Sequence, residues 1–402
     1  MEKNKNLRLF LVLVSIDFCA LIYGINSLSI SEDEAEIYFG EKSLLYYITH
    51  FGTLLLGQND FGLRIPFLFF HVLSCILLFL LALKYTKTQN DAILALLLFI
   101  LLPGSVASAL LVNKASLVIL LSLAILCAYE YKKQILFYIL LIFALFVDKS
   151  FNILFLTFFF FGIYKKNSLL FTLSLVLFAL SLSFYGFEVS GRPRGHFLDT
   201  LGIFAACFSP LIFVYFFYVI YRLSFKNNKS LLWFLMSVTF IFCSLLSLRQ
   251  KLYLEEFLPF CVISTPLLIK TLIESYRVRL PQFRLKYKIF IQCSVIFLLI
   301  CYVVIVANQF LYYFLEPKRH FANNYHFAKE LSIELKKQNI NALRVDKNLQ
   351  QRLKFYGIKD SNTFYLKSID NKKNLNSNEK IIEVKLGKSN KIYQIKSYEK
   401  SI

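Results

Sequence analysis

The chain has 402 residues, of which 57% are hydrophobic and 17% are charged, and its formal net charge is +20. A soluble domain of this size usually carries about 25% charged residues, so the composition excludes a soluble enzyme, a DNA-binding protein and a disordered chain. The charge is unevenly distributed, because 43 of the first 316 residues are charged against 27 of the last 86. The sequence therefore predicts a membrane domain over residues 1–316 and a small soluble domain over residues 317–402.

Apolar runs in the first domain are the predicted membrane spans. About twenty apolar residues cross a bilayer core, and the runs predict about eleven transmembrane helices, of which 134–147 and 151–164 are among the shortest. The first run is longer than the apolar part of a signal peptide, so we expect an uncleaved first helix. The runs lie near residues 8–29, 65–83, 92–111, 115–129, 134–147, 151–164, 167–185, 202–221, 231–248, 255–273 and 288–313.

The basic residues of the loops predict the orientation of these spans. If the N-terminus is cytoplasmic, the loop ends on that side hold 17 Lys and Arg residues, whereas the opposite side holds eight apart from the tail. Because cytoplasmic loops carry the excess of Lys and Arg, we expect a cytoplasmic N-terminus. An odd number of spans then puts the C-terminal domain in the periplasm, with the chain in a bacterial inner membrane.

The first predicted outer loop is unusually acidic. Four acids lie within the five residues 32–36, directly after the first span. Residues 35–57 are rich in aromatic residues and Leu, which predicts one or two amphipathic helices in the periplasmic membrane interface. A carboxylate cluster held just above the bilayer suits a substrate whose tail is in the membrane, and a solvated loop is the alternative interpretation.

Cations at the outer ends of the predicted spans form a second group. Charges at membrane depth are costly and are usually paired or functional, so several converging cations would make a phosphate site, with snorkelling to the headgroups as the alternative. Asp17 lies inside the first span, either as a structural acid in an internal pair or with a direct role. The outer cations are Lys149, Arg192, Arg194, Arg249 and Lys251.

Short motifs follow one another in a characteristic order over about residues 1–275. Asp33-Glu34-Ala35 follows the first span, Glu41-Lys42 comes next, and Gly62-Leu63-Arg64-Ile65-Pro66 begins the second span. A turn with a Lys follows at 146–150, and an Arg/Lys-x-Tyr segment lies at 247–253. In this order and topology the chain resembles the polytopic C-type (GT-C) glycosyltransferases, namely the aminoarabinose transferases of lipid A and the bacterial relatives of the protein O-mannosyltransferases (family thirty-nine).

The chain departs from the pattern of that family at two places. Ser43 and Leu44 stand where the family has a Pro-Pro pair, and Asn113-Lys114 stands where the family often has an Asp. The second departure puts any function of a second acid in question.

The resemblance implies a GT-C fold and transfer of a sugar from a polyprenyl-phosphate donor to lipid A, a glycan or a protein at the periplasmic face, with inversion of the anomeric centre. In that reaction we expect Asp33 to be the general base, with Glu34 orienting the acceptor or modulating Asp33. Arg64 is expected to bind substrate or to pair with a carboxylate of the first loop. The residues expected to bind the donor phosphate are Lys149, Arg249, Lys251 and Tyr253, and the weaker substrate-binding candidates are Lys42, Arg64, Arg192, Arg194 and His196.

The sequence assigns no cofactor. A divalent metal on the acidic loop is compatible with the carboxylates, but nothing in the spacing requires one. The eight Cys residues lie in or beside the apolar runs, and the five His residues show no metal-ligand spacing, so we predict neither disulfides nor a zinc site. Membrane lipids are expected partners, and nucleic acid is not.

The last 86 residues predict a small α/β domain. Residues 321–337 have a helical pattern and 349–355 predict a short helix, and strand-like runs lie at 342–345, 362–367, 380–386 and 391–398. We expect this domain to be a structural cap or a basic surface that recognises the acceptor or lipid headgroups. For the whole chain, the alternatives are a glycan ligase or polymerase that uses a lipid diphosphate, a lipid or glycan transporter, and a non-catalytic membrane scaffold.

Overall fold

The computed structural model describes residues 2–186, 195–251, 256–316, 319–361, 364–369 and 380–397. The chain packs into two compact units. The first comprises Met1–Cys19, Phe67–Ala109 and Asn113–Tyr302, and the second comprises Ala20–Pro66, Leu110–Val112 and Val303–Ile402. The segment predicted to form interfacial helices at 35–57 therefore belongs to the same unit as the C-terminal segment.

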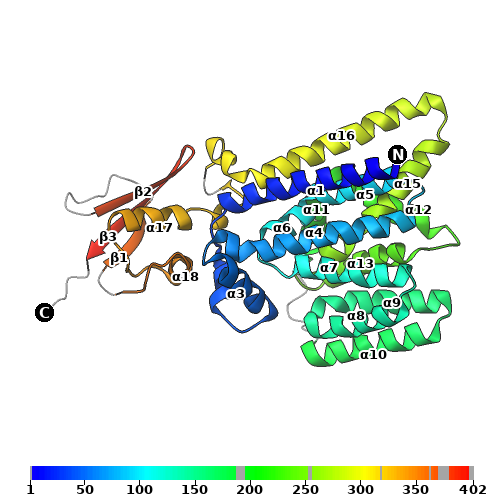
Figure 1. Ribbon diagram of the computed structural model, residues 1–402, viewed down its shortest axis with the longest axis horizontal. Helices are drawn as coiled ribbons and strands as arrows, with labels where there is room; N and C mark the ends of the chain where they lie inside the picture. Colours follow the sequence, from blue (N-terminus) through cyan, green and yellow to red (C-terminus); the bar gives the residue numbers. More distant parts are fainter. Residues whose placement is uncertain are drawn as a thin grey trace. The chain divides into compact units, whose positions relative to one another are not determined.

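The first unit is helical (Figure 1), and each apolar run of the sequence is helical in the structure. Polar caps begin several of the helices: the side chains of Thr88, Asn167 and Ser230 accept hydrogen bonds from the first turns of α5, α10 and α13. The elements that lie wholly or mostly in this unit are α1 (Glu2–Ser27), α4 (Asp60–Tyr85), α5 (Gln89–Leu101), α6 (Pro103–Leu110), α7 (Ala115–Glu130), α8 (Gln134–Val147), η1 (Lys149–Phe151), α9 (Asn152–Lys165), α10 (Ser168–Tyr185), α11 (Phe197–Phe208), α12 (Pro210–Ser224), α13 (Leu231–Ser247), α14 (Leu258–Val262), α15 (Thr265–Val278) and α16 (Pro281–Val306).

Long apolar helices make the chain a multi-pass membrane protein. Among the described residues, five helices are long and apolar enough to cross a bilayer, or up to seven if each of two bent helix pairs is one span. The helices α7, α8 and α13 are apolar but shorter, so the count of eleven spans stays a prediction.

The run at 202–221 is two helices rather than one straight span. The axes of α11 and α12 differ by 106°. The break falls at Ser209, whose φ of +66° lies in the left-handed region, and Pro210 follows it. Proline lacks the N–H that would continue the ladder of α11 and disfavours helical backbone at the residue before it, which accounts for the bend.

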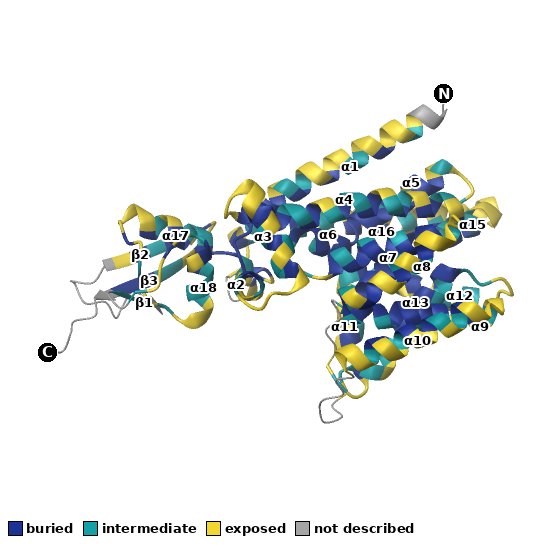
Figure 2. Cartoon of the chain, turned by 60° about the horizontal axis from the view of Figure 1, so that its bottom comes forward, coloured by how far each residue is buried: buried dark blue, intermediate teal, exposed yellow. Residues whose placement is uncertain are grey.

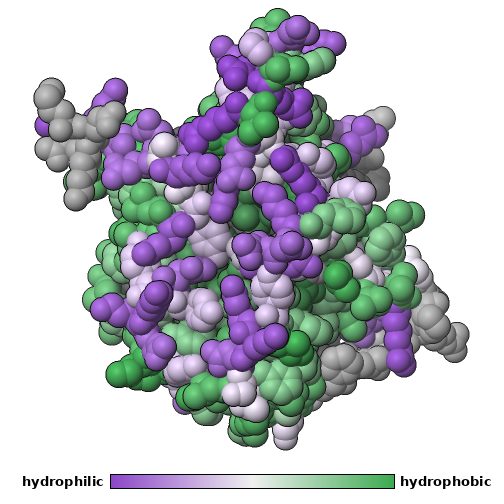
Figure 3. Space-filling view, turned by 90° about the vertical axis from the view of Figure 1, so that its right-hand side faces the viewer, coloured by the Kyte–Doolittle hydropathy of each residue, from purple (hydrophilic) through white to green (hydrophobic). Residues whose placement is uncertain are grey.

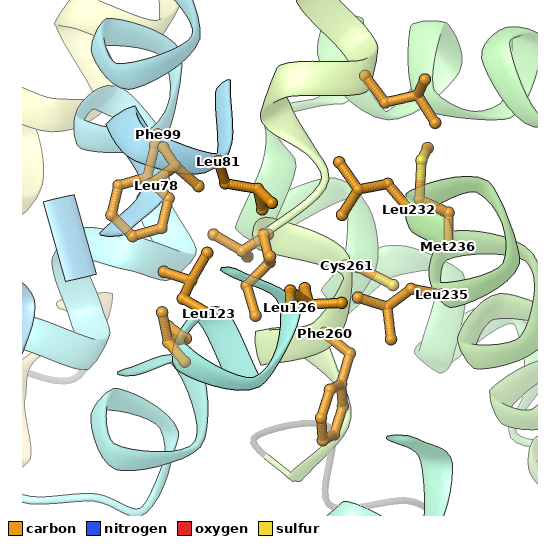
Figure 4. Packing of buried hydrophobic residues seen from close by; sticks show 14 of the residues in the cluster. Leu78, Leu81, Phe99, Leu123, Leu126, Leu232, Leu235, Met236, Phe260 and Cys261 are labelled. Carbon is orange, nitrogen blue, oxygen red and sulfur yellow. The ribbon is translucent and has the colours of Figure 1, made fainter. Parts of the chain in front are cut away.

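The core of the first unit is formed by aliphatic and aromatic side chains of its central helices. Leu78 and Phe99 from α4 and α5 pack with Leu126 from α7 and Leu235 from α13 (Figure 4). Figure 2 shows mostly buried residues in α7 and α13, whereas α1 exposes residues along its length. An apolar helix that leaves its own side chains exposed, as α1 does with Leu11 and Ile16, is suited to contact with lipid.

The second unit combines two short helices near the N-terminus with an α/β C-terminal part. Its sheet has the order β1-β3-β2 with antiparallel pairs, and Val384 and Ile395 pack with Leu331 and Leu353 in its core. The predicted α/β domain is confirmed, although 342–345 forms isolated bridges rather than a strand. The elements are α2 (Glu32–Phe39), α3 (Leu44–Leu56), η3 (Asn308–Tyr313), η5 (Asn323–Tyr325), α17 (Ala328–Lys337), α18 (Lys347–Phe355), β1 (Phe364–Ile369), β2 (Lys380–Leu386) and β3 (Ser389–Ser397).

Candidate active site

The acidic loop of the sequence is the start of helix α2. Ser31 is the N-cap, and its hydroxyl accepts from the Glu34 N–H while the Glu34 carboxylate accepts from the Ser31 N–H. This reciprocal pair is the capping box that Ser-x-x-Glu sequences form. Glu32 and Asp33 occupy the exposed first turn, where the helix dipole stabilises negative charge.

Glu34 points into the protein and forms a buried ion pair with Arg64. The Arg64 Nη2 lies 2.5 Å from Glu34 Oε2, and its Nε lies 3.2 Å from Oε1. Oε1 also accepts from the Val112 N–H at 3.0 Å. Both oxygens of Glu34 are therefore occupied, and the expected pairing of Arg64 with a carboxylate of the first loop is confirmed.

Side chains from other elements bind the backbone of the segment between α1 and α2. Arg64 donates to the carbonyl oxygens of Leu28 and Ser29, at 3.2 and 2.9 Å. Arg352, in α18, donates to the Ile30 carbonyl at 2.7 Å, and the Ile30 N–H donates to the Tyr356 hydroxyl at 2.9 Å. These bonds fix the backbone that leads to Asp33.

The C-terminal part also reaches Asp60, at the start of α4. The Lys329 Nζ lies 3.0 Å from Asp60 Oδ2, and the Tyr356 hydroxyl donates to Asp60 Oδ1 at 2.6 Å. Burial, together with the Asp60 charge, raises the pKa of Tyr356 well above its ordinary value. The C-terminal part therefore contacts the start of α4, and its role as a structural cap stays a prediction. Its recognition of an acceptor stays a prediction.

The segment at 35–57, predicted to form one or two amphipathic helices, contains the helices α2 and α3, and their place in the membrane interface stays a prediction. The His50 ring stacks between Tyr38 and Tyr46, at centroid distances of 4.2 and 3.9 Å. Helix α3 also exposes apolar side chains such as Phe51 and Leu54, as an interfacial helix does. Lys42 is exposed in the turn between α2 and α3.

Glycines let α3 approach the start of α4 closely. A Cβ on Gly52 would lie 2.3 Å from the Gly62 carbonyl oxygen. Only residues without a side chain allow the two backbones to meet at this distance. A Cβ on Gly62 would itself lie 2.2 Å from the Gly57 carbonyl oxygen, so Gly62, two residues before Arg64, also has a packing role.

The first unit holds a separate cluster of alternating charges around η1. The Lys114 Nζ lies 2.6 Å from Asp148 Oδ2, and the Lys149 Nζ lies 3.2 Å from Glu256 Oε1. Asp148 also caps η1 through the Ser150 N–H. We call these four residues, Lys114, Asp148, Lys149 and Glu256, the charged cluster.

The other predicted phosphate-binding residues lie at helix ends of the first unit. Arg249 and Lys251 are exposed just after α13. His196 precedes α11, and its N–H donates to the Ser247 carbonyl at the end of α13, at 3.1 Å, which brings these two helix ends together. Three predicted site residues, Arg192, Arg194 and Tyr253, lie outside the described residues.

Several residues of these clusters were not predicted from the sequence. Glu256 and Lys114 belong to the charged cluster, and Lys329, Arg352 and Tyr356 hold the acidic loop. Glu256 could have been predicted because it is an acidic residue at the start of an apolar segment, where charges are costly. Nothing local distinguishes the three C-terminal residues from the other basic and aromatic residues of that segment.

Asp17 forms an internal pair inside the first unit. Its Oδ2 lies 2.9 Å from the His71 Nε2, and its Oδ1 accepts from the Tyr302 hydroxyl at 2.8 Å, so the internal pair weighed for this acid is confirmed. Within the described residues, Asp17 with His71 and Cys75 is also the one group of three potential metal ligands close together. The acids of α2 do not form such a group in that part of the chain.

The comparisons with known proteins identify the fold. No protein-family model and no curated protein matches the chain. A crystal structure of ArnT from Cupriavidus metallidurans in the apo state matches over 98% of both chains, with a TM-score of 0.53 and 12% identity. A second ArnT structure from that organism, bound to undecaprenyl phosphate, matches over 97% of both chains, with a TM-score of 0.54 and 10% identity.

The chain has the ArnT fold. ArnT is an aminoarabinose lipid A transferase of the GT-C type, the type that the sequence motifs resemble, so the predicted fold class is confirmed. At 10–12% identity the ArnT likeness describes the fold alone.

Proposed function

We propose that this chain is an integral membrane glycosyltransferase that takes its sugar from a polyprenyl-phosphate donor. The observation that carries the proposal is the likeness to ArnT along nearly the whole of both chains, including an ArnT structure bound to undecaprenyl phosphate. The acidic helix and the charged cluster support it, because sugar transfer needs a base and a phosphate site. The fold alone would not indicate a reaction.

Asp33 is the proposed general base. Its carboxylate takes the proton of the acceptor hydroxyl while the hydroxyl oxygen attacks the anomeric carbon. The new carbon–oxygen bond forms as the bond to the phosphate oxygen breaks, and that electron pair leaves with the phosphate. Attack opposite the leaving group inverts the anomeric centre.

Glu34 is proposed to act through the position of α2 rather than on the acceptor. Both its oxygens are taken up by Arg64, Val112 and the Ser31 N–H. A carboxylate with this many donors is a poor base, because each hydrogen bond to the charged form stabilises it. The network thereby holds the first turn of α2 in place and leaves Asp33 exposed to reach a substrate.

Lys149 is the proposed main ligand of the donor phosphate. The phosphate gains negative charge as the sugar leaves, and a fixed cation stabilises that charge. Before the donor binds, the Glu256 carboxylate lies 3.2 Å from the Lys149 Nζ and compensates its charge. Arg249 and Lys251 are proposed to assist from the end of α13.

The test is sugar transfer by the purified full-length chain in proteoliposomes. Donors carrying undecaprenyl phosphate and undecaprenyl diphosphate are offered with lipid A as acceptor, and the released lipid is identified by mass spectrometry. Release of undecaprenyl phosphate supports the proposal. Turnover of the diphosphate donor alone would assign the chain to the glycan ligases or polymerases.

The acceptor and the side of the membrane are further parts of the proposal. We propose a periplasmic acceptor, which is lipid A, a glycan or a protein, and mass spectrometry of lipid A and glycoproteins from a deletion strain identifies it. An alkaline phosphatase fused after Ile402 is expected to be active, because that enzyme needs an oxidising compartment for its disulfides. If the phosphatase fusion is inactive and a cytoplasmic reporter at the same position is active, the C-terminus lies in the cytoplasm and the proposed orientation is wrong.

A further inference from the structure

A basic cavity lies at the end of the first unit where α12 and α15 stop. Its volume is about 650 Å³, and its lining includes five cations from separate parts of the chain. Figure 3 shows hydrophilic side chains gathered over this end. None of these residues has a part in the proposed sugar transfer. The five cations are Lys87, Arg222, Lys226, Arg277 and Arg279.

All three arginines of this cavity are held in place by partners. Arg222 donates to the hydroxyls of Tyr218 and Ser275. The Arg277 Nη2 lies 3.1 and 3.0 Å from the two oxygens of Asp91. The Arg279 guanidinium lies 4.2 Å from the centre of the Tyr287 ring. Each guanidinium has five N–H donors, so a partner that fixes one edge leaves donors for an anion. Fixed guanidiniums lose less side-chain entropy on binding than loose ones.

The acids near this cavity do not balance its cations. Glu274 lines it, 3.8 Å from Lys226, and Asp91 pairs with Arg277. Five cations thus face two acids, and the excess positive charge selects an anion. Planar guanidiniums favour phosphate, because they match two of its oxygens at once.

An apolar cavity of about 110 Å³ lies further along the same helices. Its walls are side chains of α5, α12, α15 and α16, with Ser294 among otherwise apolar and aromatic residues. Leu94, Phe290 and Val295, which line it, are partly exposed on the outer surface of the unit. The cavity is therefore accessible from the side that faces the lipid chains of a membrane.

The two cavities are consecutive along α12 and α15. On α12, Tyr215 lines the apolar cavity and Tyr218 the basic one, and on α15 the same change occurs between Leu272 and Ser275. Three residues of helix correspond to about 4.5 Å. An apolar space is thus followed within one helical turn by a basic one, which is the profile of an amphiphile with an anionic head.

We propose that this pair of cavities binds one anionic phospholipid, with its phosphate among the arginines and an acyl chain between α5, α12, α15 and α16. The charge excess selects the headgroup, and the apolar cavity distinguishes a lipid from a free phosphate. The end concerned is the one predicted to face the cytoplasm, where anionic lipids attract basic residues. The site does not depend on the proposed sugar transfer.

The experiment is native mass spectrometry of the full-length protein released from nanodiscs. The probes are phosphatidylglycerol, phosphatidylcholine, undecaprenyl phosphate and inorganic phosphate. The head variant is Lys87→Gln/Arg279→Gln, which leaves the Arg277–Asp91 pair intact, and the chain variant is Ser294→Phe, which fills the apolar cavity. The matched control is Lys165→Gln/Lys166→Gln, which removes two cations at the end of α9, outside the site.

Wild-type protein is expected to retain phosphatidylglycerol over phosphatidylcholine. The head variant should bind phosphatidylglycerol about thirtyfold more weakly, because two cations are lost. The chain variant should also lose this lipid, whereas the control variant should bind it as wild type does. Equally weakened phosphatidylglycerol binding in the control variant would mean that general surface charge, and not this site, causes the effect. Displacement of phosphatidylglycerol by inorganic phosphate or by undecaprenyl phosphate at equal concentration would also overturn the proposal. Retention of undecaprenyl phosphate beside phosphatidylglycerol is expected from the separate donor site, and the wild-type comparison of probes needs no variant to fold.

Discussion

The Arg64 guanidinium binds both carboxylate oxygens of Glu34, with the two side chains buried. The pair joins the start of α4 to the first turn of α2. It also anchors the segment that precedes the acidic turn, because Arg64 donates to the carbonyls of Leu28 and Ser29. The proposed catalytic residue Asp33 thus sits on a support made of fully bonded buried groups.

Removing one member of this pair should be strongly destabilising. Arg64→Met leaves Glu34 buried without its partner, and breaking a buried ion pair in this way costs about 3–5 kcal/mol. We expect a clear fall in the thermal unfolding midpoint of the detergent-solubilised protein. Glu34→Gln/Arg64→Met should recover part of that loss, since no uncompensated charge is left. An Arg64→Met protein as stable as wild type would exclude a supporting role for the pair.

Asp33→Asn should abolish transfer without loss of folding. A general base contributes about 10²–10⁴ in rate, and Asp33 lies in an exposed turn, so kcat should fall by that factor while the unfolding midpoint stays unchanged. Glu32→Gln is the matched control, because it removes an exposed acid from the same turn and should leave kcat within a few-fold of wild type. Equal losses in both variants would indicate a general effect of negative charge, and unchanged kcat in Asp33→Asn would remove the assignment.

Lys149→Met should weaken donor binding, whereas Glu256→Gln should not. Lys149→Met removes the proposed phosphate ligand and should raise the KM for the donor. Glu256→Gln removes the carboxylate that competes for Lys149 at 3.2 Å, so its KM should fall or stay the same. Steady-state kinetics at varied donor concentration separates these results. A higher KM in both variants would mean that the pair serves only to hold the structure.

His326 should make the second unit sensitive to acid. Burial, followed by the charges of His320, Arg64 and Arg352, lowers the pKa of His326 from 6.5 to about 3. An unfolded chain takes up the proton below pH 6.5 whereas the folded chain does not, so the stability is fully present above pH 6.5. It is lost as the pH falls towards 3, by up to about 1.4 kcal/mol per pH unit.

The measurement for His326 is pulse proteolysis of the C-terminal segment between pH 7.5 and 5. His326→Gln is the comparison, because its side-chain amide retains a donor for the Asn308 side-chain oxygen, which the His326 Nε2 contacts at 2.8 Å, and does not titrate. Wild-type protein should lose more stability than this variant over that range. Parallel pH profiles would show that other groups dominate the acid response.

The helices and caps of this protein follow from local features of its sequence. Each apolar run is helical in the structure, and the Ser31–Glu34 spacing already contains the capping box of α2. These features depend on neighbours within one or two turns, because side-chain periodicity and caps are properties of local backbone. The order of the motifs was also enough to predict the GT-C fold that the ArnT structures share.

Which charged residues form ion pairs depends on the tertiary packing. Asp60 and Tyr356 are 296 residues apart and form one hydrogen bond. Lys149 and Glu256, from distant parts of the sequence, form an ion pair at 3.2 Å. The 106° bend at Ser209 likewise divides a run that looks continuous. Such pairs depend on how whole helices pack. Burying a charge costs free energy unless an opposite charge lies close to it, and the fold determines which one does. That information lies in the packing of the whole chain and in no local pattern.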